Sequence, residues 1–226
     1  MGAVPRRPAG VVIVAAQRGA REFVRAHTEV SRAPLVPEIA LHLATESTPL
    51  WRATEEWLGE RGVAPPYWAF AWAGGQALAR TILDAPEIVR GRRVVDFGCG
   101  GGLVALAAMR AGAASARAID RDPVALVALA LNAELNDVRV EAERADTLFV
   151  GEAEVVLAGD VFYERADAGD IVRALEAARA EGCEVFAGCP GRLFSPEGVA
   201  VYRYVDVPGA LELEGREVAV TKVLRF

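Results

Sequence analysis

The chain has 226 residues, of which 53% are hydrophobic and 25% are charged, a composition typical of globular proteins rather than of disordered, collagen-like or membrane-spanning chains. Its apolar runs, such as 11–16 and 124–131, fall far short of the roughly 18 to 20 residues needed to cross a bilayer. The formal net charge of -6 argues against nucleic acid as a partner, because it provides no overall basic surface. We therefore expect one α/β domain that binds neither membranes nor nucleic acid.

The cysteine and histidine content argues against several kinds of active site. The chain has three cysteines, Cys99, Cys183 and Cys189, with no C-x-x-C pair among them, and its only histidines are His27 and His42. This pattern excludes a disulfide scaffold and a standard zinc site, and it argues against a catalytic triad built on histidine. We therefore expect no bound metal ion and a reaction that relies on an already activated cofactor.

The N-terminal part of the chain is expected to be helical. We predict a flexible tail over 1–19, followed by a single domain over 20–226 that consists of an N-terminal helical extension, 20–90, and a Rossmann-like core, 91–226. The helical interpretation rests on apolar residues between proline breaks, such as those within 39–43.

An aromatic segment lies within this extension. Residues 67–72 contain two tryptophans, a tyrosine and a phenylalanine, and they lead into a helix predicted from Gln76 to Leu83. Aromatic side chains in a loop before a helix are suited to lining a ligand site.

The core alternates strand-like and helix-like segments, which is typical of a parallel sheet with crossover helices. The predicted strands lie at about 92–97, 115–119, 138–142, 154–159 and 183–188. The predicted helices lie near 102–112, 123–136 and 167–181. The chain ends on two strand-like segments, 199–207 and 216–226, and the turn between them at 208–215 is too short for a helix. We expect these two strands to pair as an antiparallel hairpin.

A glycine-rich loop follows the first strand of the core. Asp96 is followed by glycines at Gly98, Gly100 and Gly102, directly before a predicted helix. Glycine permits a positive φ and a close approach of the backbone to a ligand, as a strand-to-helix nucleotide loop requires. The dinucleotide fingerprint needs a glycine where this chain has Leu103. The spacing favours S-adenosyl-L-methionine over NAD, because methyltransferases for this donor carry an acidic-x-Gly-x-Gly-x-Gly loop.

Two further carboxylates follow successive predicted strands. Asp120 ends the second strand, where a carboxylate can accept from both hydroxyls of a ribose. Asp146 follows the third strand and could accept from the adenine amino group, although a solvated loop aspartate is the alternative. Asp122 precedes a proline and is interpreted as a helix cap. Carboxylates at the carboxyl ends of neighbouring parallel strands converge on one edge of the sheet, so we expect a shared site there.

The residues after the fourth strand indicate what accepts the methyl group. Asp160 and Tyr163 lie where the substrate of such a fold meets the cofactor. A carboxylate attracts an ammonium group and an aromatic face adds a cation–π contact, so the pair suits an amine. Phe162 is interpreted as part of the core.

Together these segments resemble the lysine methyltransferases of the electron transfer flavoprotein β subunit. The resemblance covers about 34–226. The residues that carry it are 37–45, Leu50, Trp51, 66–80, the Asp96 loop, 159–163 and 188–192. The segment from Tyr67 to Arg80 is its most specific part, although Ala73 stands where the animal enzymes have proline.

The resemblance implies a Rossmann-like, seven-strand class I methyltransferase sheet that is mostly parallel and uses S-adenosyl-L-methionine. It implies that Asp160 and Tyr163 serve substrate and catalysis, and that Trp72 and Gln76 lie beside the cofactor. The implied substrate is the flavoprotein β subunit, with a ribosomal protein as a further candidate. We expect a monomer, and the composition favours a bacterial, cytoplasmic enzyme.

Three other interpretations stay open at this point. One is a methyltransferase for a ribosomal protein or a small-molecule amine, which would be favoured by turnover of free amines. The second is a dinucleotide oxidoreductase, which the C-terminal hairpin argues against because NAD-type sheets usually continue in parallel. The third is a cofactor-binding module without catalysis, and turnover distinguishes it from an enzyme.

Overall fold

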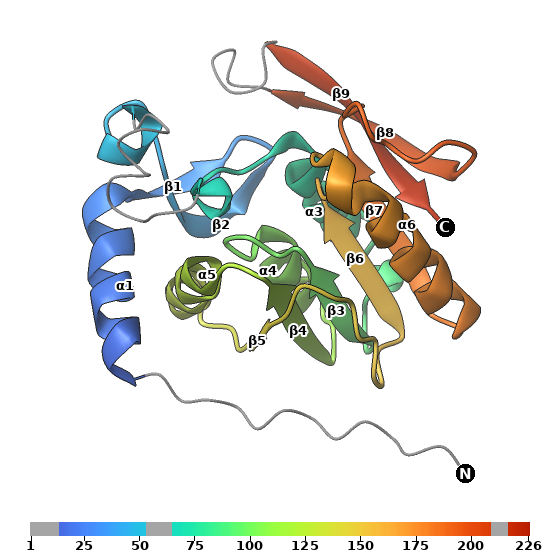
Figure 1. Ribbon diagram of the computed structural model, residues 1–226, viewed down its shortest axis with the longest axis horizontal. Helices are drawn as coiled ribbons and strands as arrows, with labels where there is room; N and C mark the ends of the chain where they lie inside the picture. The colour runs from blue at the N-terminus through green and yellow to red at the C-terminus, as the bar shows by residue number, and fades with distance from the viewer. Residues whose placement is uncertain (1–13, 53–64, 209–216) are drawn as a thin grey trace.

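A computed structural model describes residues 14–52, 65–208 and 217–226 (Figure 1). The described elements before the core are α1 (Val14–His27), β1 (Glu29–Ala33), β2 (Val36–Leu43), η1 (Pro49–Arg52), η2 (Tyr67–Ala69), α3 (Ala73–Asp84) and η3 (Pro86–Ile88). Those of the core are β3 (Arg93–Phe97), α4 (Leu103–Arg110), β4 (Ser115–Asp120), α5 (Pro123–Leu135), β5 (Glu141–Arg144), β6 (Val155–Gly159), α6 (Arg165–Ala180), β7 (Glu184–Cys189), β8 (Ala200–Pro208) and β9 (Val218–Arg225).

Strands β3 to β9 form a seven-stranded sheet in the order β5-β4-β3-β6-β7-β9-β8 (Figure 1). The first five strands in this order are parallel, and β9 runs antiparallel between β7 and β8. The predicted fold class, including the C-terminal hairpin, is confirmed. Because β4 and β6 flank β3 on opposite sides, the strand order reverses at β3, and such a reversal opens a crevice at the carboxyl ends of the strands.

The two faces of the sheet are covered by different helices. Along β6, Val155 and Leu157 belong to the same buried cluster as the apolar faces of α3 and α4. The alternate residues Val156 and Ala158 pack with α6 on the other face. This alternation of side chains is the reason why β6 is apolar throughout its length, as expected for a parallel strand buried on both faces.

The helical interpretation of the N-terminal extension is wrong over residues 29–43. These residues form the antiparallel hairpin β1–β2, with pairs from Glu29 and Leu43 to Arg32 and Ala40. The apolar residues at 39, 41 and 43 recur every second position, which is the period of a strand rather than that of a helix. Short helices and turns do occur on either side of the hairpin.

Several boundaries also differ from the sequence-based expectations. Helix α1 begins at Val14, so the last residues of the expected 1–19 tail are helical, whereas 1–13 lie outside the described residues. Strand β5 starts at Glu141, three residues later than predicted. The predicted helical residues of 53–62 and most of the 208–215 turn also lie outside the described residues. The division of the domain into an extension and a core stays a prediction.

Two asparagines, Asn132 in α5 and Asn136 at its C-cap, attach the hairpin to the core. The Asn132 side chain accepts from the His42 backbone N–H (2.7 Å). Asn136 accepts from the Ala40 N–H (3.0 Å) and donates to the Ala40 carbonyl (2.7 Å). These bonds satisfy backbone groups on the free side of β2, which would otherwise be an exposed strand edge.

Among the described helices, none is long and apolar enough to span a membrane.

Candidate active site

The glycine loop connects β3 to α4 at the carboxyl edge of the sheet. Gly98, Gly100 and Gly102 have φ values of 67°, 52° and 87°, a region that favours glycine over residues with a Cβ. At Gly102 a Cβ atom would also come within 2.2 Å of the Leu129 side chain. The three predicted glycines are therefore needed for the shape of the loop, and Gly102 also for its packing on α5.

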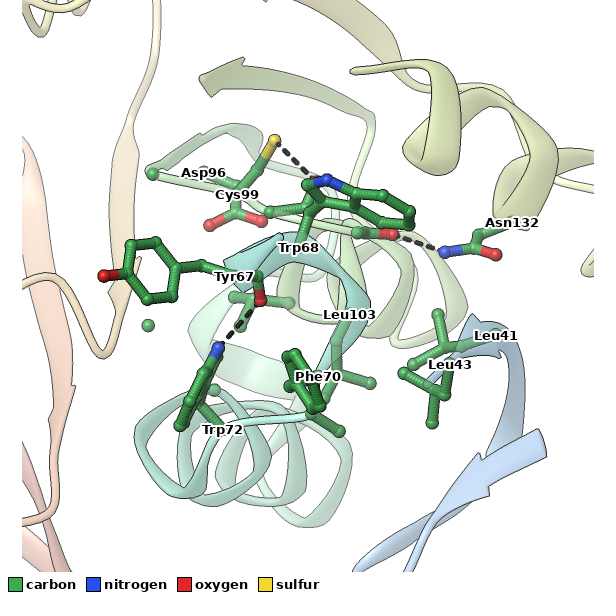
Figure 2. Close-up of a pocket in the computed structure, with 17 residues that line it drawn as sticks. Leu41, Leu43, Tyr67, Trp68, Phe70, Trp72, Asp96, Cys99, Leu103 and Asn132 are labelled. Carbon is green, nitrogen blue, oxygen red and sulfur yellow. Dashed lines mark hydrogen bonds between the residues drawn. The ribbon is translucent and has the colours of Figure 1, made fainter. Parts of the chain in front are cut away.

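A pocket lies against this loop (Figure 2). Its walls come from the loop and the start of α4, from the aromatic segment before α3, and from the inner side of β2. The lining residues used below are Tyr67, Trp68, Trp72, Asp96, Gly98 and Asn132. Figure 2 shows Trp68 beside the loop, with Phe70 and Trp72 on the stretch that leads into α3. The aromatic residues before this helix do line a pocket, and their part in a ligand site stays a prediction.

Asp96 lies at the end of β3 and is 1% exposed. Its Oδ2 accepts a hydrogen bond from the Ala105 N–H (2.9 Å), whereas Oδ1 has no hydrogen-bond partner among the described residues. Burial raises the pKa of the Asp96 carboxyl to about 7, and the nearby Asp120 charge contributes in the same direction. A buried, unpartnered carboxylate oxygen that lines a pocket is suited to a cationic donor group on a ligand.

Asp120 lies at the end of β4 and holds the glycine loop. Its Oδ2 accepts from the Gly100 N–H (2.8 Å) and its Oδ1 from the Asp122 N–H (2.9 Å). Burial raises the pKa of the Asp120 carboxyl. Each oxygen keeps a second lone pair, so two hydroxyl donors could still bind. Asp122 caps α5 by accepting from the Val124 N–H (2.8 Å), as predicted.

The other predicted cofactor residues differ in their placement. Trp72 lines the pocket and donates its Nε1–H to the Tyr67 carbonyl (2.8 Å). Gln76 does not line this pocket, because its Nε2 donates to the Ala71 carbonyl (2.6 Å) and its Oε1 accepts from the Leu35 N–H (3.3 Å). Asp146 is exposed at a bend after β5 and is not part of the pocket wall.

The predicted acceptor-side residues lie next to this pocket, after β6. Asp160 is 7% exposed, whereas Tyr163 is 41% exposed and its ring centre is 5.2 Å from that of Tyr67. Burial raises the pKa of the Tyr163 hydroxyl. Phe162 is fully buried, which confirms its interpretation as a core residue.

Three residues of the site carried no individual role in the prediction, although Trp68 belongs to the predicted aromatic segment 67–72. Asn132 donates to the Gly101 carbonyl (2.8 Å), Trp68 contributes a pocket wall, and Arg192 pairs with Asp160. Arg192 follows the β7 strand in the segment 188–192, which carries part of the family resemblance. Since β7 lies beside β6 in a parallel sheet, an arginine there falls at the same edge as Asp160.

The geometry fits an S-adenosyl-L-methionine-type cofactor, because it offers an acceptor for a cationic amino group. The pocket combines the closely approaching backbone of a glycine loop, the Asp96 Oδ1 that has no partner among the described residues, and aromatic walls. Across the described ranges, no group of three or more histidine, cysteine, aspartate or glutamate side chains is placed to hold a metal ion.

Comparison with known proteins identifies the family. The electron transfer flavoprotein beta subunit lysine methyltransferase of Xenopus laevis is 43% identical over 177 residues, covering 76% of this chain and 70% of that protein. The Rattus norvegicus protein of the same name is 36% identical over 178 residues, covering 76% of this chain and 68% of its own length. The chain belongs to this family.

Other comparisons concern the methyltransferase core. The family model for ribosomal protein L11 methyltransferase (PrmA) matches residues 77–161, which contain the glycine loop and Asp160. Wild-type Trm5b from Pyrococcus abyssi has a similar fold, with a TM-score of 0.51 at 15% identity, over 89% of this chain and 56% of that one. The lysine methyltransferase family thus places its site on a fold shared with other proteins.

Proposed function

We propose that this chain is an S-adenosyl-L-methionine-dependent protein-lysine N-methyltransferase that acts on the electron transfer flavoprotein β subunit. The observation that carries the proposal is the identity to relatives named for this activity, which reaches 43% over 177 residues. The pocket supports it independently, because the glycine loop and the unpartnered Asp96 oxygen are arranged for a ligand with a cationic group. Cytoplasmic location is part of the proposal.

Each side of the cofactor would be held by different residues. Asp96 would accept from the cofactor's amino group, Asp120 from the ribose hydroxyls, and Asp146 from the adenine amino group. The cofactor supplies a methyl group already activated by a sulfonium. Trp72 and Tyr163 would then flank the path by which a lysine side chain reaches the methyl group.

The chain's own contribution is positioning. A lysine amine attacks with its nitrogen lone pair, so it must first lose a proton, which costs about 4 kcal/mol at pH 7.5 for an unperturbed lysine. The proton that the amine loses can pass to water. Alignment of the amine and the methyl group in a partly dry, aromatic slot lowers the barrier without a dedicated histidine base.

Peptide mass spectrometry tests the proposal. Unmethylated flavoprotein β subunit is incubated with the enzyme and S-adenosyl-L-methionine, with Asp160→Asn in a parallel reaction. We expect lysine mass gains of one to three methyl groups with the wild type and a strong reduction with the variant. Self-methylation is easily recognised, because Lys222 is the only lysine of the enzyme.

A second acceptor is the alternative outcome. The ribosomal protein L11 methyltransferase of Bordetella parapertussis is 44% identical to this chain, but only over 72 residues and 24% of that protein. Methyl groups from labelled cofactor that appear on ribosomal proteins or free amines, with none on the flavoprotein, would keep the donor and replace the acceptor.

A further inference from the structure

The Asp160 carboxylate is fixed from three directions. Arg192 donates Nε–H to Oδ1 (2.9 Å) and an Nη2–H to Oδ2 (3.0 Å), and the Gly74 N–H donates to Oδ2 (3.1 Å). Gly74 lies in the first turn of α3, where the helix dipole also favours a negative charge. The Asp160 side chain is 4% exposed, so this ion pair is shielded from water on the side of the carboxylate.

The backbone at this position is also constrained. Asp160 has a φ of 61°, a conformation that is strained for a residue other than glycine. Its N–H donates to the Gly188 carbonyl at the end of β7 (2.9 Å). Strained residues persist where the surroundings determine their position, and they are concentrated at functional sites.

Arg192 reaches Asp160 from the loop after β7. Its guanidinium carbon lies 5.5 Å from the centre of the Trp72 ring, and Trp72 lines the cofactor pocket. The Arg192 carbonyl accepts from both the N–H and the hydroxyl of Ser195, so the backbone of this loop is held in place. The positive charge is therefore directed to the border between the pocket and Asp160.

This arrangement changes the role expected of Asp160. A lone buried carboxylate would stabilise the lysine as an ammonium ion and raise its pKa, although methyl transfer requires the neutral amine. Arg192 already balances the Asp160 charge with a bidentate pair. A lysine amine that binds beside the Asp160–Arg192 pair therefore meets a carboxylate whose charge is balanced by the guanidinium.

We propose that Arg192 is a positioning residue that orients the Asp160 carboxylate and, by balancing its charge, keeps the target lysine neutral for methyl transfer. The inference rests on the proposed lysine methyltransferase function. Arg192 also sets the geometry, because its planar fork fixes the plane of the carboxylate.

Other charged and titratable groups surround the proposed lysine position. Tyr67 on η2 and Tyr163 after β6 face it, and Arg121 and Glu164 pair behind Tyr163 (3.1 Å). Asp96 and Asp120 lie on the side of the glycine loop, and Cys189 is buried at the end of β7. The first turn of α3 carries no titratable side chain. All of these groups are unchanged in the variants below, so they do not account for differences between them.

The test is the pH dependence of kcat, measured from pH 6 to 10 with saturating cofactor and saturating protein substrate. Saturation matters because kcat reports pKa values in the enzyme–substrate complex. On the acid side of the profile kcat falls as the lysine becomes protonated, and we call this fall the acid limb. Arg192→Gln removes the balancing charge, so we expect the acid limb of this variant to lie about one pH unit or more higher than that of the wild type. Its rate at pH 7.5 falls about tenfold and approaches that of the wild type at high pH.

Neutralising Asp160 instead of Arg192 provides the sharpest comparison, because it changes the net charge of the pair in the opposite direction. Asp160→Asn leaves Arg192 positive, so its acid limb is expected to move down. The double variant Arg192→Gln/Asp160→Asn removes both charges, and its limb should return toward that of the wild type. Arg192→Lys keeps the charge without the fork, so its limb stays in place while kcat falls. Arg203→Gln is the matched control, because Arg203 pairs with Asp84 on the surface (2.8 Å), and its profile should not change.

Stability and cofactor binding are measured in parallel, by thermal unfolding and by titration with S-adenosyl-L-homocysteine. Unchanged affinity for this ligand shows that each variant keeps the pocket. Profiles that are parallel to the wild type but lower would overturn the inference, since they indicate a structural role only. The inference would also be overturned if Arg192→Gln had a lower KM for the protein substrate and an unchanged acid limb. That result would mean that Arg192 competes with the lysine amine for the Asp160 carboxylate. Wild-type turnover of lysine tests the proposed function by itself, so the two ideas fail separately.

Discussion

The Asp96 carboxyl group combines deep burial with an incomplete set of hydrogen bonds. Among the described residues only its Oδ2 has a partner, the Ala105 N–H, and burial raises the pKa of Asp96 to about 7. A protonated Asp96 is neutral and tolerates this environment, whereas an ionised Asp96 leaves a charge with one hydrogen bond. A cationic ligand that binds at Asp96 would therefore stabilise its ionised form.

This placement predicts a pH-dependent effect on stability. The folded-state pKa of about 7 exceeds the ordinary value of 3.8, so the folded chain binds this proton more tightly than the unfolded chain. The contribution of Asp96 to stability is fully present below about pH 4 and is lost as the pH rises through 7. Asp96→Asn cannot ionise, so its free energy of unfolding relative to the wild type should increase by on the order of 2 kcal/mol from pH 5 to 8.

Denaturant unfolding of the ligand-free protein at both pH values measures this difference. Asp146→Asn is the control, because Asp146 is exposed and should show little change. A difference between Asp96→Asn and the wild type that is the same at pH 5 and pH 8 would show that Asp96 does not titrate in this range.

At the scale of elements, α5 links two parts of the site. Asn132 is fully buried and connects β2, through the His42 N–H, with the glycine loop, through the Gly101 carbonyl. Asn132→Ala would leave two buried backbone groups without partners, so we expect a loss of about 2–4 kcal/mol in the free energy of unfolding.

Leu135→Ala in the same helix is the control for Asn132→Ala. Leu135 is 42% exposed, so its truncation should change stability by less than about 0.5 kcal/mol. Chemical unfolding monitored by circular dichroism gives both values. Equal small effects of the two substitutions would mean that Asn132 is not a structural link.

Two adjacent glycines of α3 should respond differently to the same substitution. At Gly74 a Cβ would come within 2.5 Å of the Gly188 carbonyl oxygen and 2.8 Å of the Asp160 Cβ, so the helix could not keep its distance from β6 and β7. At Gly75 a Cβ would meet no heavy atom of the described residues within 4 Å. We expect Gly74→Ala to be strongly destabilising and Gly75→Ala to stabilise by up to about 1 kcal/mol, as alanine does in a helix.

The same unfolding assay compares the two glycine variants. Comparable losses for both would contradict the close contact of α3 with the ends of β6 and β7. A loss at Gly74 alone would support the position of the Gly74 N–H beside Asp160, on which the role of Arg192 depends.

At the scale of the whole molecule, the core was more predictable than the N-terminal part. The βα alternation, the glycine loop and the cap at Asp122 are local patterns, and each has a direct physical cause in the sequence. The hairpin β1–β2 was missed because its proline breaks hid a short period-two pattern. The hairpin packs its apolar side into the main core, and its β2 backbone is held by Asn132 and Asn136, about 90 residues away in the chain; no local pattern reports such contacts.

The candidate site shows the same division. The positions of Asp96 and Asp120 followed from their strands, since side chains at the ends of parallel strands converge. The place of Gln76 beside the cofactor stays a prediction; in the structure its amide bonds to Ala71 and Leu35 and joins α3 to the hairpin. Its role depends on the three-dimensional placement of the hairpin, and the same holds for the pairing of Arg192 with Asp160.

The most direct test of the account is calorimetric titration of the wild type and Asp96→Asn with S-adenosyl-L-homocysteine at pH 6 and pH 8. With a pKa of about 7 for Asp96, ionisation and hence affinity of the wild type should rise about tenfold between these values. Asp96→Asn should bind more weakly at pH 8 and show little pH dependence. Equal affinities of the two proteins at pH 8, or no binding by the folded wild type, would contradict the assignment of this pocket to the methyl donor.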